Sequence, residues 1–401
     1  MLKLQEFIEK NNNWEELLIA EPYYLIIKKE PINEQEDYVL FKYDQINSDF
    51  SLEVVQEARG IIFQINKITK NIKPVCIPFF KFFNLGEKYA AKLHEKSITF
   101  LEKRDGSLIK LWFNKEKWHW STNGSIFAEN AHLFDEKNEE NQRKTEKNEV
   151  CNQIKLTFYD LILKSKEYNY IIKMIENNNL DKNLTYMFEL TSPQAKIVVP
   201  YEGTHLTFLS ARNNYTLLEQ DYDFGEFQEK IPRPIKYDIL SLSAAKNVVE
   251  GFSFKKEGLV AVDKNYNRVK IKSPAYLVVS YLRLNGDVTE KRIIDIIQQG
   301  EASEFLSYYP EYSKDFEIVQ NKINKYKETI KAVITEEIIN TAPISSGDIY
   351  RRYQDRPFER TIATAWWKNE FIDQWIKNKT TDKLQELINQ NEQVKEDKKY
   401  E

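Results

Sequence analysis

The sequence predicts an α+β protein in which a β-rich first domain is followed by an all-helical C-terminal domain. Between about residues 38 and 273, short apolar or alternating runs are separated by turn residues, which is typical of strands with helices between them. After Pro274, apolar residues recur every three or four positions, as they do on one face of a helix. We therefore expect a first domain over residues 1–275, a helical domain over 276–392 and a charged tail over 393–401.

The expected strands of the first domain are short and bounded by polar or turn-forming residues. Two of them flank the polar break at Asn114–Lys117, which predicts a hairpin and hence antiparallel pairing. In the second domain, Ile323, Tyr326, Ile330 and Ile334 share one face of an expected helix. The strands are expected at Gly60–Ile65, Leu108–Phe113, Trp118–Ser121, Thr185–Leu190, Leu206–Ser210, Leu259–Val262 and Arg268–Ile271.

The charge balance excludes one class of nucleic-acid-binding protein. The 401 residues contain 58 Lys and Arg against 62 Asp and Glu, so the formal net charge is −4. A protein that binds nucleic acid through a uniformly basic surface carries a strong positive charge, and this chain does not. Any nucleic-acid site must therefore be a local basic patch.

The spacing of the cysteine, histidine and apolar residues excludes several other classes of protein. Cys76, Cys151 and the four histidines show no CxxC or HExxH spacing, so structural zinc, a disulfide scaffold and Cys–His catalysis are not expected. No apolar run approaches the roughly 18 residues that a membrane span needs, and the first residues lack the pattern of a secretory leader. We therefore expect a cytoplasmic protein without a membrane partner.

The clearest motif is Lys103-Arg-Asp-Gly-Ser107, which stands directly before an expected strand. Taken alone, Asp-Gly is a common β-turn sequence, and a turn is its simplest interpretation. Other charged residues, however, occupy comparable positions along the chain. Arg59 opens one expected strand and Glu257 precedes another. Together these residues favour a chemical role for Lys103.

Strand alternation places some of these charges on a common face. In Val269-Lys-Ile-Lys272, the two lysines share one face and the two apolar residues the other, so two ammonium groups converge on one point. Such a pair of like charges favours a bound anion. In the same way, Glu189 lies on the face opposite Phe188 and Leu190, so its carboxylate is expected to face a pocket.

Taken together, these segments resemble the covalent nucleotidyltransferase superfamily of polynucleotide ligases and RNA capping enzymes, whose signature lysine motif is K-x-D-G. The flanking residues are most similar to the phage-type RNA ligase 1 family, the ATP-dependent RNA ligases of tRNA repair. A helical domain after the last motif also fits that family, because DNA ligases and capping enzymes usually carry an OB-fold there. The resemblance covers most of residues 55–273 and rests on Ala58-Arg-Gly-Ile-Ile-Phe63, Phe80-Lys-Phe-Phe-Asn84, Lys103-Arg-Asp-Gly-Ser107, Phe188-Glu-Leu-Thr-Ser-Pro193 and Lys270-Ile-Lys272.

The resemblance implies an antiparallel-sheet nucleotidyltransferase domain over residues 1–275, including an N-terminal extension, with Lys103 as its nucleophile. The Lys103 amine would attack the α-phosphate of ATP, with Mg²⁺ or Mn²⁺, to give lysyl-AMP and pyrophosphate. The AMP would then pass to an RNA 5′-phosphate, and a 3′-hydroxyl would attack to seal the strand. A lysine amine is ordinarily protonated at pH 7 and must lose its proton before it can attack. Repulsion from the positive charges of Lys270, Lys272 and the metal would favour the neutral form of Lys103.

The resemblance also implies the other site residues, position by position. In isolation each is more often a surface charge or a core aromatic residue, and their order along the chain is what favours function. Arg59 and Lys81 match triphosphate ligands, and Phe83 matches an aromatic residue of the nucleotide pocket. Glu189 matches a carboxylate that contacts the ribose. The expected nucleotide-binding residues are Arg59, Lys81, Phe83, Gly106, Glu189, Glu257, Lys270 and Lys272, with Glu257 also at the metal.

One position departs from the family pattern. Members often carry a lysine just before Gly-Ser, where this chain has Asn123 within Ser121-Thr-Asn-Gly-Ser125. An amide donates hydrogen bonds but carries no charge. We therefore assign no further phosphate contact to this position.

Other functions remain open at this point. A capping guanylyltransferase or a DNA ligase shares the same lysine chemistry, although no OB-fold pattern follows Lys272. A non-catalytic RNA-binding relative would keep the fold without turnover. Nucleotide choice, acceptor choice and self-adenylylation distinguish these alternatives.

The expected partners follow from the RNA ligase resemblance. They are RNA, in particular nicked tRNA, and a separate end-healing kinase-phosphatase, because the chain has no GxxxxGK[ST] phosphate loop. In the helical domain, Arg351, Arg352, Arg356 and Arg360 stand close in sequence to Tyr350. This mixture fits RNA phosphates and unpaired bases, but it fits a solvated helix face equally well.

Overall fold

The computed structural model describes residues 1–45, 47–133, 156–282, 289–299, 302–308, 310–334, 346–354, 356–367, 379, 381 and 384–389. The chain divides into unit 1, Met1–Arg283, and unit 2, Leu284–Glu401. Cys151 and the predicted tail over residues 393–401 lie outside the described residues. Within the described part of unit 1, helices accompany three antiparallel sheets, which confirms the prediction of an α+β fold with antiparallel strands.

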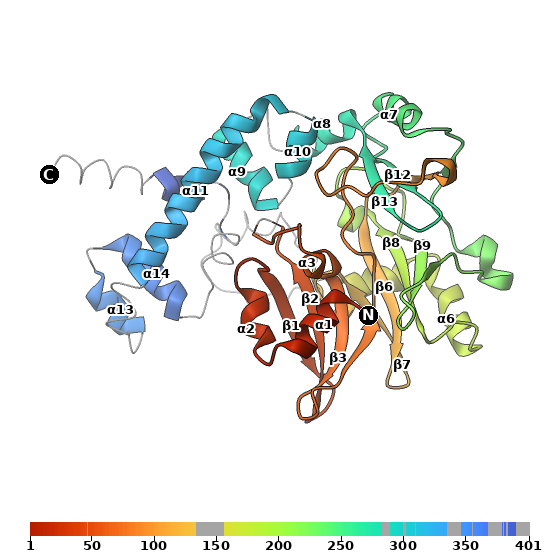
Figure 1. Cartoon of the computed structure of the whole chain (residues 1–401), viewed down its shortest axis with the longest axis horizontal. Coiled ribbons are helices and arrows are strands. Elements are labelled where there is room, and N and C mark those ends of the chain that lie inside the picture. Colours follow the sequence, from red (N-terminus) through yellow and green to blue (C-terminus); the bar gives the residue numbers. More distant parts are fainter. Residues whose placement is uncertain are drawn as a thin grey trace, which may run out of the picture. The chain divides into compact units, whose positions relative to one another are not determined.

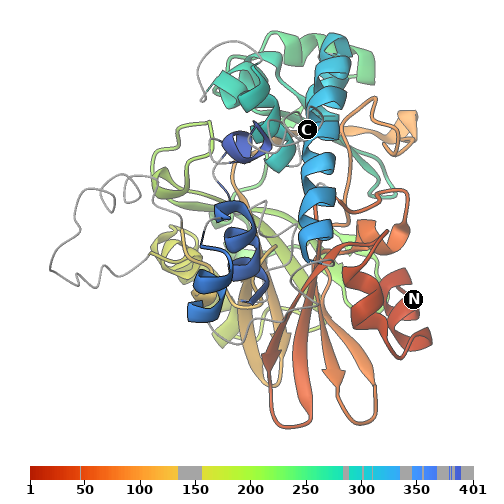
Figure 2. The same ribbon diagram turned by 90° about the vertical axis from the view of Figure 1, so that its left-hand side faces the viewer.

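The first sheet lies beside the N-terminal helices (Figure 1 and Figure 2). These elements are α1 Lys3–Lys10, α2 Trp14–Ile19, β1 Leu25–Pro31, β2 Glu36–Tyr43, α3 Glu53–Glu57, β3 Arg59–Asn66 and β4 Ile72–Cys76. The strands follow the order β1-β2-β3-β4. Leu4 and Ile8, four residues apart on α1, pack in one core with Phe41 of β2. The Glu57 carboxylate accepts hydrogen bonds from the N–H groups of Lys3 and Leu4, which satisfies the first turn of α1.

The second sheet follows the order β10-β9-β8-β6-β7 and has helices packed on one face. Its elements are β6 Ser107–Asn114, β7 Lys117–Thr122, α5 Phe158–Lys164, α6 Tyr168–Glu176, β8 Leu184–Thr191, β9 His205–Asn213 and β10 Glu219–Gln220. Asn114 pairs with Lys117, so the predicted hairpin is confirmed. Phe188 and Leu190 enter the core with Leu161 of α5. Glu189 between them therefore faces the other way, as predicted.

The third sheet follows the order β11-β5-β12-β13. Its elements and the helices after them are β5 Thr99–Lys103, β11 Lys236–Tyr237, α7 Leu242–Glu250, β12 Gly258–Val262, β13 Arg268–Lys272 and α8 Pro274–Leu282. Phe100 and Leu259 share a core with Val269 and Ile271 of β13 and with Val249 of α7. The predicted alternation of β13 is confirmed, because its apolar residues enter this core.

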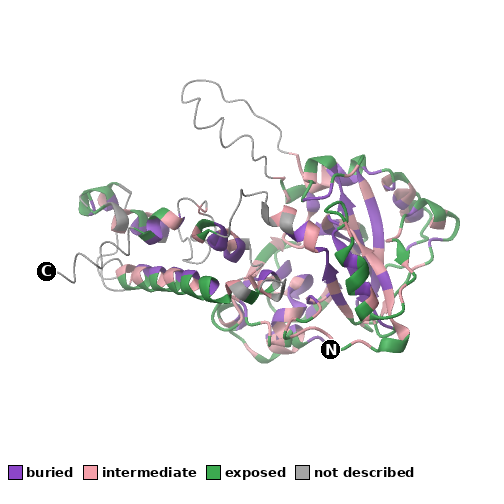
Figure 3. Cartoon of the chain, turned by 90° about the horizontal axis from the view of Figure 1, so that it is seen from above, coloured by how far each residue is buried: buried purple, intermediate pink, exposed green. Residues whose placement is uncertain are grey.

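The regular elements described in unit 2 are helices. They are α9 Glu290–Gln299, α10 Ala302–Tyr308, α11 Ser313–Val333, α13 Ser346–Arg352 and α14 Pro357–Trp367. Ile323, Tyr326 and Ile330 are buried along one side of α11, whereas Ile334 lies just beyond its end. Figure 3 shows buried residues along one side of the long helix and many buried residues in the strands of unit 1. Among the helices that the structure describes, none is long and apolar enough to cross a membrane.

All seven predicted strands are present, but the sequence did not predict β1, β2, β4, β5 or the two-residue strands β10 and β11. β1 lies before the region that we considered β-rich and ends in Lys-Lys-Glu-Pro, which hides its alternation. β4 contains Pro74, a residue that is tolerated because β4 is at the edge of its sheet.

Candidate active site

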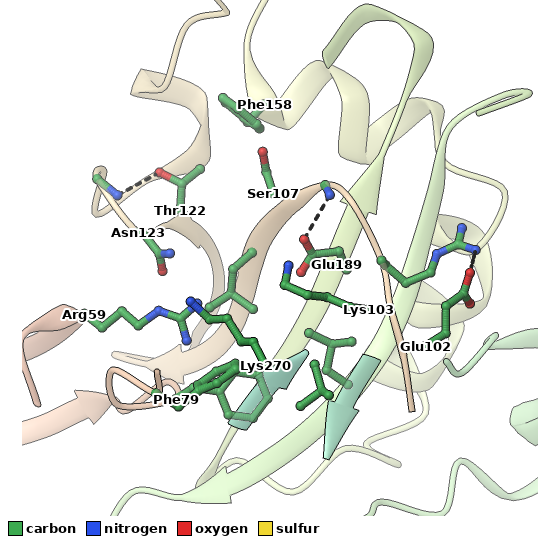
Figure 4. Close-up of a pocket in the computed structure, with 17 residues that line it drawn as sticks. Arg59, Phe79, Glu102, Lys103, Ser107, Thr122, Asn123, Phe158, Glu189 and Lys270 are labelled. Atoms are coloured by element: carbon green, nitrogen blue, oxygen red, sulfur yellow. Dashed lines mark hydrogen bonds and ion pairs between the residues drawn. The ribbon is translucent and has the colours of Figure 1, made fainter. Parts of the chain in front are cut away.

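A cavity of about 420 Å³ in unit 1 is lined by residues from all three sheets (Figure 4). β3 contributes Arg59, β5 contributes Lys103 and β13 contributes Lys270. The second sheet contributes Glu189 from β8 and Ser107 from β6. The fold therefore brings four of the predicted charged residues to one cavity.

Lys103 occupies the last position of β5 and faces a carboxylate from the neighbouring strand. It pairs with Gly258, the first residue of β12, so Glu257 stands beside it. Lys103 Nζ lies 2.6 Å from Glu257 Oε1. The Glu257 side chain is only 5% exposed and that of Lys103 19%. The nucleophile predicted from sequence is thus a largely enclosed ammonium group in direct contact with a carboxylate.

Lys272 joins the same ion-pair group from the other neighbouring strand. It also pairs with Gly258, and its Nζ lies 3.6 Å from Glu257 Oε1. Gly258 has a φ of +150°, and a Cβ there would lie 2.1 Å from the Ile271 carbonyl oxygen. Only glycine fits this position. Its small size permits the close approach of β12 and β13 beside Lys103.

The Asp-Gly turn after Lys103 is fixed by contacts that are distant in sequence. The Asp105 carboxylate accepts hydrogen bonds from the N–H groups of Val198 and Val199, at 2.8 and 2.7 Å. The Tyr276 hydroxyl of α8 donates to the other Asp105 oxygen at 2.8 Å. The segment forms a bend at Gly106, and its aspartate anchors the end of the strand that carries Lys103. Sequence reasoning missed Tyr276, because its proximity to Asp105 arises only from the fold.

Glu189 lies next to Lys103 in the cavity (Figure 4). The Gly106 N–H donates to Glu189 Oε1 at 3.1 Å. A Cβ on Gly106 would lie 2.3 Å from the Leu190 carbonyl oxygen, so glycine is required in this turn. Burial raises the pKa of Glu189 to about 7, and the charge of Glu257 adds to the increase while Lys103 opposes it.

Cations and aromatic rings form another wall of the cavity. Arg59 Cζ and Lys270 Nζ lie 5.0 and 5.3 Å from the centre of the Phe82 ring. Sequence reasoning missed Phe82 and chose the adjacent Phe83, although both belong to the same motif. Arg59 Nη1 and Asn123 Oδ1 are buried and have no hydrogen-bond partner among the residues described. These two groups are available to a polar ligand.

Lys81 and Phe83 are not brought to the Lys103 cavity. Lys81 Nζ lies 4.1 Å from the centre of the Phe50 ring and 3.2 Å from Gln45 Oε1. Phe83 is only 6% exposed, and the centre of its ring lies 6.2 Å from the centre of the Phe50 ring. Both residues line a neighbouring cavity instead. Their side chains line a different cavity from Lys103, although the Lys270 N–H donates to the Phe83 carbonyl oxygen at 2.9 Å.

The described residues contain no group of three His, Cys, Asp or Glu side chains placed to bind a metal ion. Glu257 and Glu189 remain as carboxylate ligands beside the cavity. Two carboxylates fit the mode in which Mg²⁺ is held by one or two side chains together with substrate phosphates.

Comparison with known families agrees with the arrangement of these motifs. A family model described as RNA ligase matches residues 57–276, which are 220 of the 401 residues. The chain belongs to the phage-type RNA ligase 1 family. This confirms the resemblance inferred from the sequence motifs.

Individual relatives of this RNA ligase family member come from viruses and bacteria. A protein of Autographa californica nuclear polyhedrosis virus, named for polynucleotide kinase and RNA ligase activities, is 28% identical over 83% of this chain. The chain spans 44% of that viral protein's length. An RNA ligase of Rhodothermus phage RM378 is 23% identical, over 75% of this chain and 78% of the phage protein. Among solved structures, an archaeal ATP-dependent RNA ligase aligns over 84% of each chain with 11% identity and a TM-score of 0.42.

Proposed function

We propose that the protein is an ATP-dependent RNA ligase that joins 5′-phosphate and 3′-hydroxyl RNA ends. Membership of the RNA ligase family supports RNA ligation. The covalent route is supported by one observation above all: Lys103 Nζ lies 2.6 Å from Glu257 Oε1, at a cavity that also contains Arg59 and Lys270. An amine nucleophile beside a proton acceptor and phosphate-binding cations is what nucleotidyl transfer requires.

In the first step, Lys103 loses a proton and its neutral Nζ attacks the α-phosphorus of ATP. The N–P bond forms, the P–O bond to the β-phosphate breaks, and pyrophosphate leaves with the bonding electron pair. Glu257 Oε1 is close enough to accept the proton of Lys103 directly. Lys272, whose Nζ lies 3.6 Å from the same oxygen, keeps a positive charge at the site after the transfer.

The other residues of the cavity bind and orient the nucleotide in this proposal. Arg59, Lys270 and Lys272 neutralise phosphate oxygens, and the buried Arg59 Nη1 is available for such a contact. Glu189 accepts hydrogen bonds from the ribose hydroxyls, and the Gly106 N–H holds its carboxylate in place. Lys81 and Phe83, which line the neighbouring cavity, keep the nucleotide-binding role that the family resemblance implies as a prediction.

The proposal includes a divalent cation that binds with the nucleotide. Glu257 would hold Mg²⁺ or Mn²⁺ together with the phosphates, since no group of three protein ligands exists in the described part of the chain. When bound there, the cation would neutralise phosphate charge.

Two further transfers complete the proposed reaction. The N–P bond of lysyl-AMP breaks as an oxygen of the RNA 5′-phosphate attacks the AMP phosphorus, which gives adenylylated RNA and restores Lys103. An RNA 3′-hydroxyl then attacks the 5′-phosphate phosphorus and loses its proton. The new P–O bond seals the strand as AMP leaves.

We further propose that the substrate is nicked tRNA, selected by an all-helical C-terminal domain over 276–392 and repaired in the cytoplasm. A separate kinase-phosphatase would prepare the RNA ends, since the sequence has no phosphate-loop motif. The viral relative named for both kinase and ligase activities supports such a pairing of end healing with sealing.

Incubation with Mg²⁺ and ATP labelled at the α-phosphate tests the proposal. We expect a labelled protein band on a denaturing gel for the wild type and none for Lys103→Ala. The variant keeps the Glu257–Lys272 pair, so we expect it to remain folded by circular dichroism. A labelled band in Lys103→Ala would exclude Lys103 as the nucleophile.

The same assay distinguishes the alternatives. Labelling with GTP only would indicate a capping guanylyltransferase, and sealing of nicked DNA in preference to RNA would indicate a DNA ligase. Absence of labelling with either nucleotide, in folded protein first freed of bound AMP by pyrophosphate, would indicate a non-catalytic RNA-binding relative.

A further inference from the structure

A second cavity, of about 630 Å³, lies beside the Lys103 cavity in unit 1. Phe79 and Phe82 line both cavities and so form a shared aromatic wall. The other lining residues come from α3, from the segment after β4, from β9 and β10 with the turn between them, and from the turn between β12 and β13 with the start of β13. Apart from Lys81 and Phe83, none of its lining residues belongs to the nucleotide-binding set that the sequence predicts.

Positive charge predominates among the described residues that line the second cavity. Its lining includes four cationic side chains, Lys81, Arg212, Lys264 and Arg268, and one carboxylate, Glu219. Arg212 Nη2 lies 3.0 Å from Glu219 Oε2, and Arg268 Nη1 lies 2.9 Å from the same oxygen. One carboxylate neutralises only one of the two guanidinium groups, so this enclosed cluster keeps a net positive charge. In a chain with a net charge of −4, such a local excess favours an anionic ligand.

Aromatic rings alternate with these cations around the second cavity. The ring centres of Tyr89 and Phe83 are 5.9 Å apart, and Arg212 Cζ lies 4.4 Å from the centre of the Phe80 ring. Tyr89 and Phe80 are both partly exposed, so their rings are accessible from the cavity. Aromatic faces combined with cations are typical of sites for unpaired nucleotides, whose bases stack while their phosphates pair with Lys or Arg.

We propose that the second cavity binds an unpaired nucleotide of the RNA substrate. Its base stacks on Tyr89 and Phe80, and its phosphate lies beside Lys264 and Arg268. This inference rests on the proposed function and extends it, because a nucleotide held there lies across the Phe79–Phe82 wall from Lys103. A volume of about 630 Å³ is within the range of sites that enclose a small molecule.

Two pairs of variants test this assignment in the full-length protein. Tyr89→Ala removes the ring, whereas Tyr89→Phe keeps it and serves as the matched control. Lys264→Glu reverses a charge in the cavity, whereas Lys246→Glu reverses the charge of an exposed lysine of α7 that lines neither cavity. Each protein is titrated into a short unpaired RNA with a fluorescent 3′ end, without ATP or metal, and binding is followed by anisotropy.

We expect Tyr89→Ala to weaken RNA binding by roughly tenfold, the size of one lost base-stacking contact, and Tyr89→Phe to bind as the wild type does. Lys264→Glu should weaken binding and lower the slope of log Kd against log salt by about 0.7, the value for one phosphate of a single strand. Lys246→Glu should change neither. Lysyl-AMP formation from ATP should be unchanged in all four variants.

RNA affinity that is unchanged in both Tyr89→Ala and Lys264→Glu would overturn the assignment. Loss of lysyl-AMP formation at low ATP in these variants would also overturn it, because the cavity would then bind ATP rather than RNA. One further outcome would contradict the proposed ligase function but not the RNA site. If the wild type forms no lysyl-AMP while Tyr89→Ala still weakens RNA binding, the ligase proposal fails and the RNA site stands.

Discussion

The charge of Lys103 is balanced within a group of three side chains rather than a simple pair. Glu257 Oε1 lies 2.6 Å from Lys103 Nζ and 3.6 Å from Lys272 Nζ. In an enclosed site, a carboxylate between two ammonium groups is stabilised by both, and the group as a whole retains one positive charge. In the proposed reaction, transfer of a proton from Lys103 to Glu257 would leave Lys272 as that charge.

The protonation of Glu189 should make the free energy of unfolding depend on pH. Burial raises its pKa from the ordinary glutamate value of 4.5 to about 7, so the folded state favours the protonated form. The stability contribution of Glu189 is therefore fully present below about pH 4.5 and is lost as the pH rises through about 7. Glu189→Gln copies the neutral form and keeps an acceptor for the Gly106 N–H.

We therefore expect Glu189→Gln to become more stable than the wild type as the pH rises from about 5 to 8, by about 2 kcal/mol. Urea unfolding of both proteins across this range measures the difference. Glu226→Gln, a change at an exposed carboxylate outside the cavity, is the control and should show no such trend. A difference that is independent of pH would contradict the raised pKa of Glu189.

Three strands of the third sheet meet at one glycine beside Lys103. Gly258 pairs with Lys103 of β5 on one side and with Lys272 of β13 on the other. Its φ is +150°, and the Ile271 carbonyl oxygen would lie 2.1 Å from any Cβ at this position, so there is no room for a side chain. The strand ends, and so both lysines, keep their places only if this position stays small.

Gly258→Ala should therefore separate β12 from β13, lower the free energy of unfolding by about 2–4 kcal/mol and abolish lysyl-AMP formation. Gly251→Ala is the matched control: its φ is −82°, and the nearest atom to an added Cβ lies at 3.5 Å. That variant should fold and react as the wild type does. Thermal denaturation and ATP labelling measure both variants, and normal labelling in Gly258→Ala would contradict the tight packing.

The elements that the sequence predicted correctly are those with one face in a core. Val269 and Ile271 enter the core, so strand alternation placed Lys270 and Lys272 together correctly. The segment that carries Lys81 and Phe83 has no regular strand or helix, and so no periodicity indicated which side chains face the Lys103 cavity. Long-range contacts were equally hidden. Nothing in the sequence around Asp105 indicates that its carboxylate receives the hydroxyl of Tyr276, 171 residues away.

At the scale of the whole molecule, the distribution of charge matters more than its sum. The net charge of −4 excluded a uniformly basic surface, and the structure gathers cations around two neighbouring cavities of unit 1. Cations gathered in this way attract phosphates at short range without making the whole protein bind every nucleic acid. The family match at residues 57–276 lies entirely within the same unit.

Because the residues that line both cavities belong to unit 1, the two units should be separable in function. We expect a chain that ends at residue 283 to form lysyl-AMP as the full-length protein does, since it keeps Lys103, Glu257 and Lys272. We expect the same truncation to lose any preference for nicked tRNA over unstructured RNA, if the helices of unit 2 select tRNA. Competition between the two RNAs in sealing assays, with the full-length chain as control, measures this preference. An equal preference for tRNA in the truncated chain would place tRNA selection in unit 1, and loss of lysyl-AMP in a folded truncated chain would show that nucleotide transfer needs unit 2.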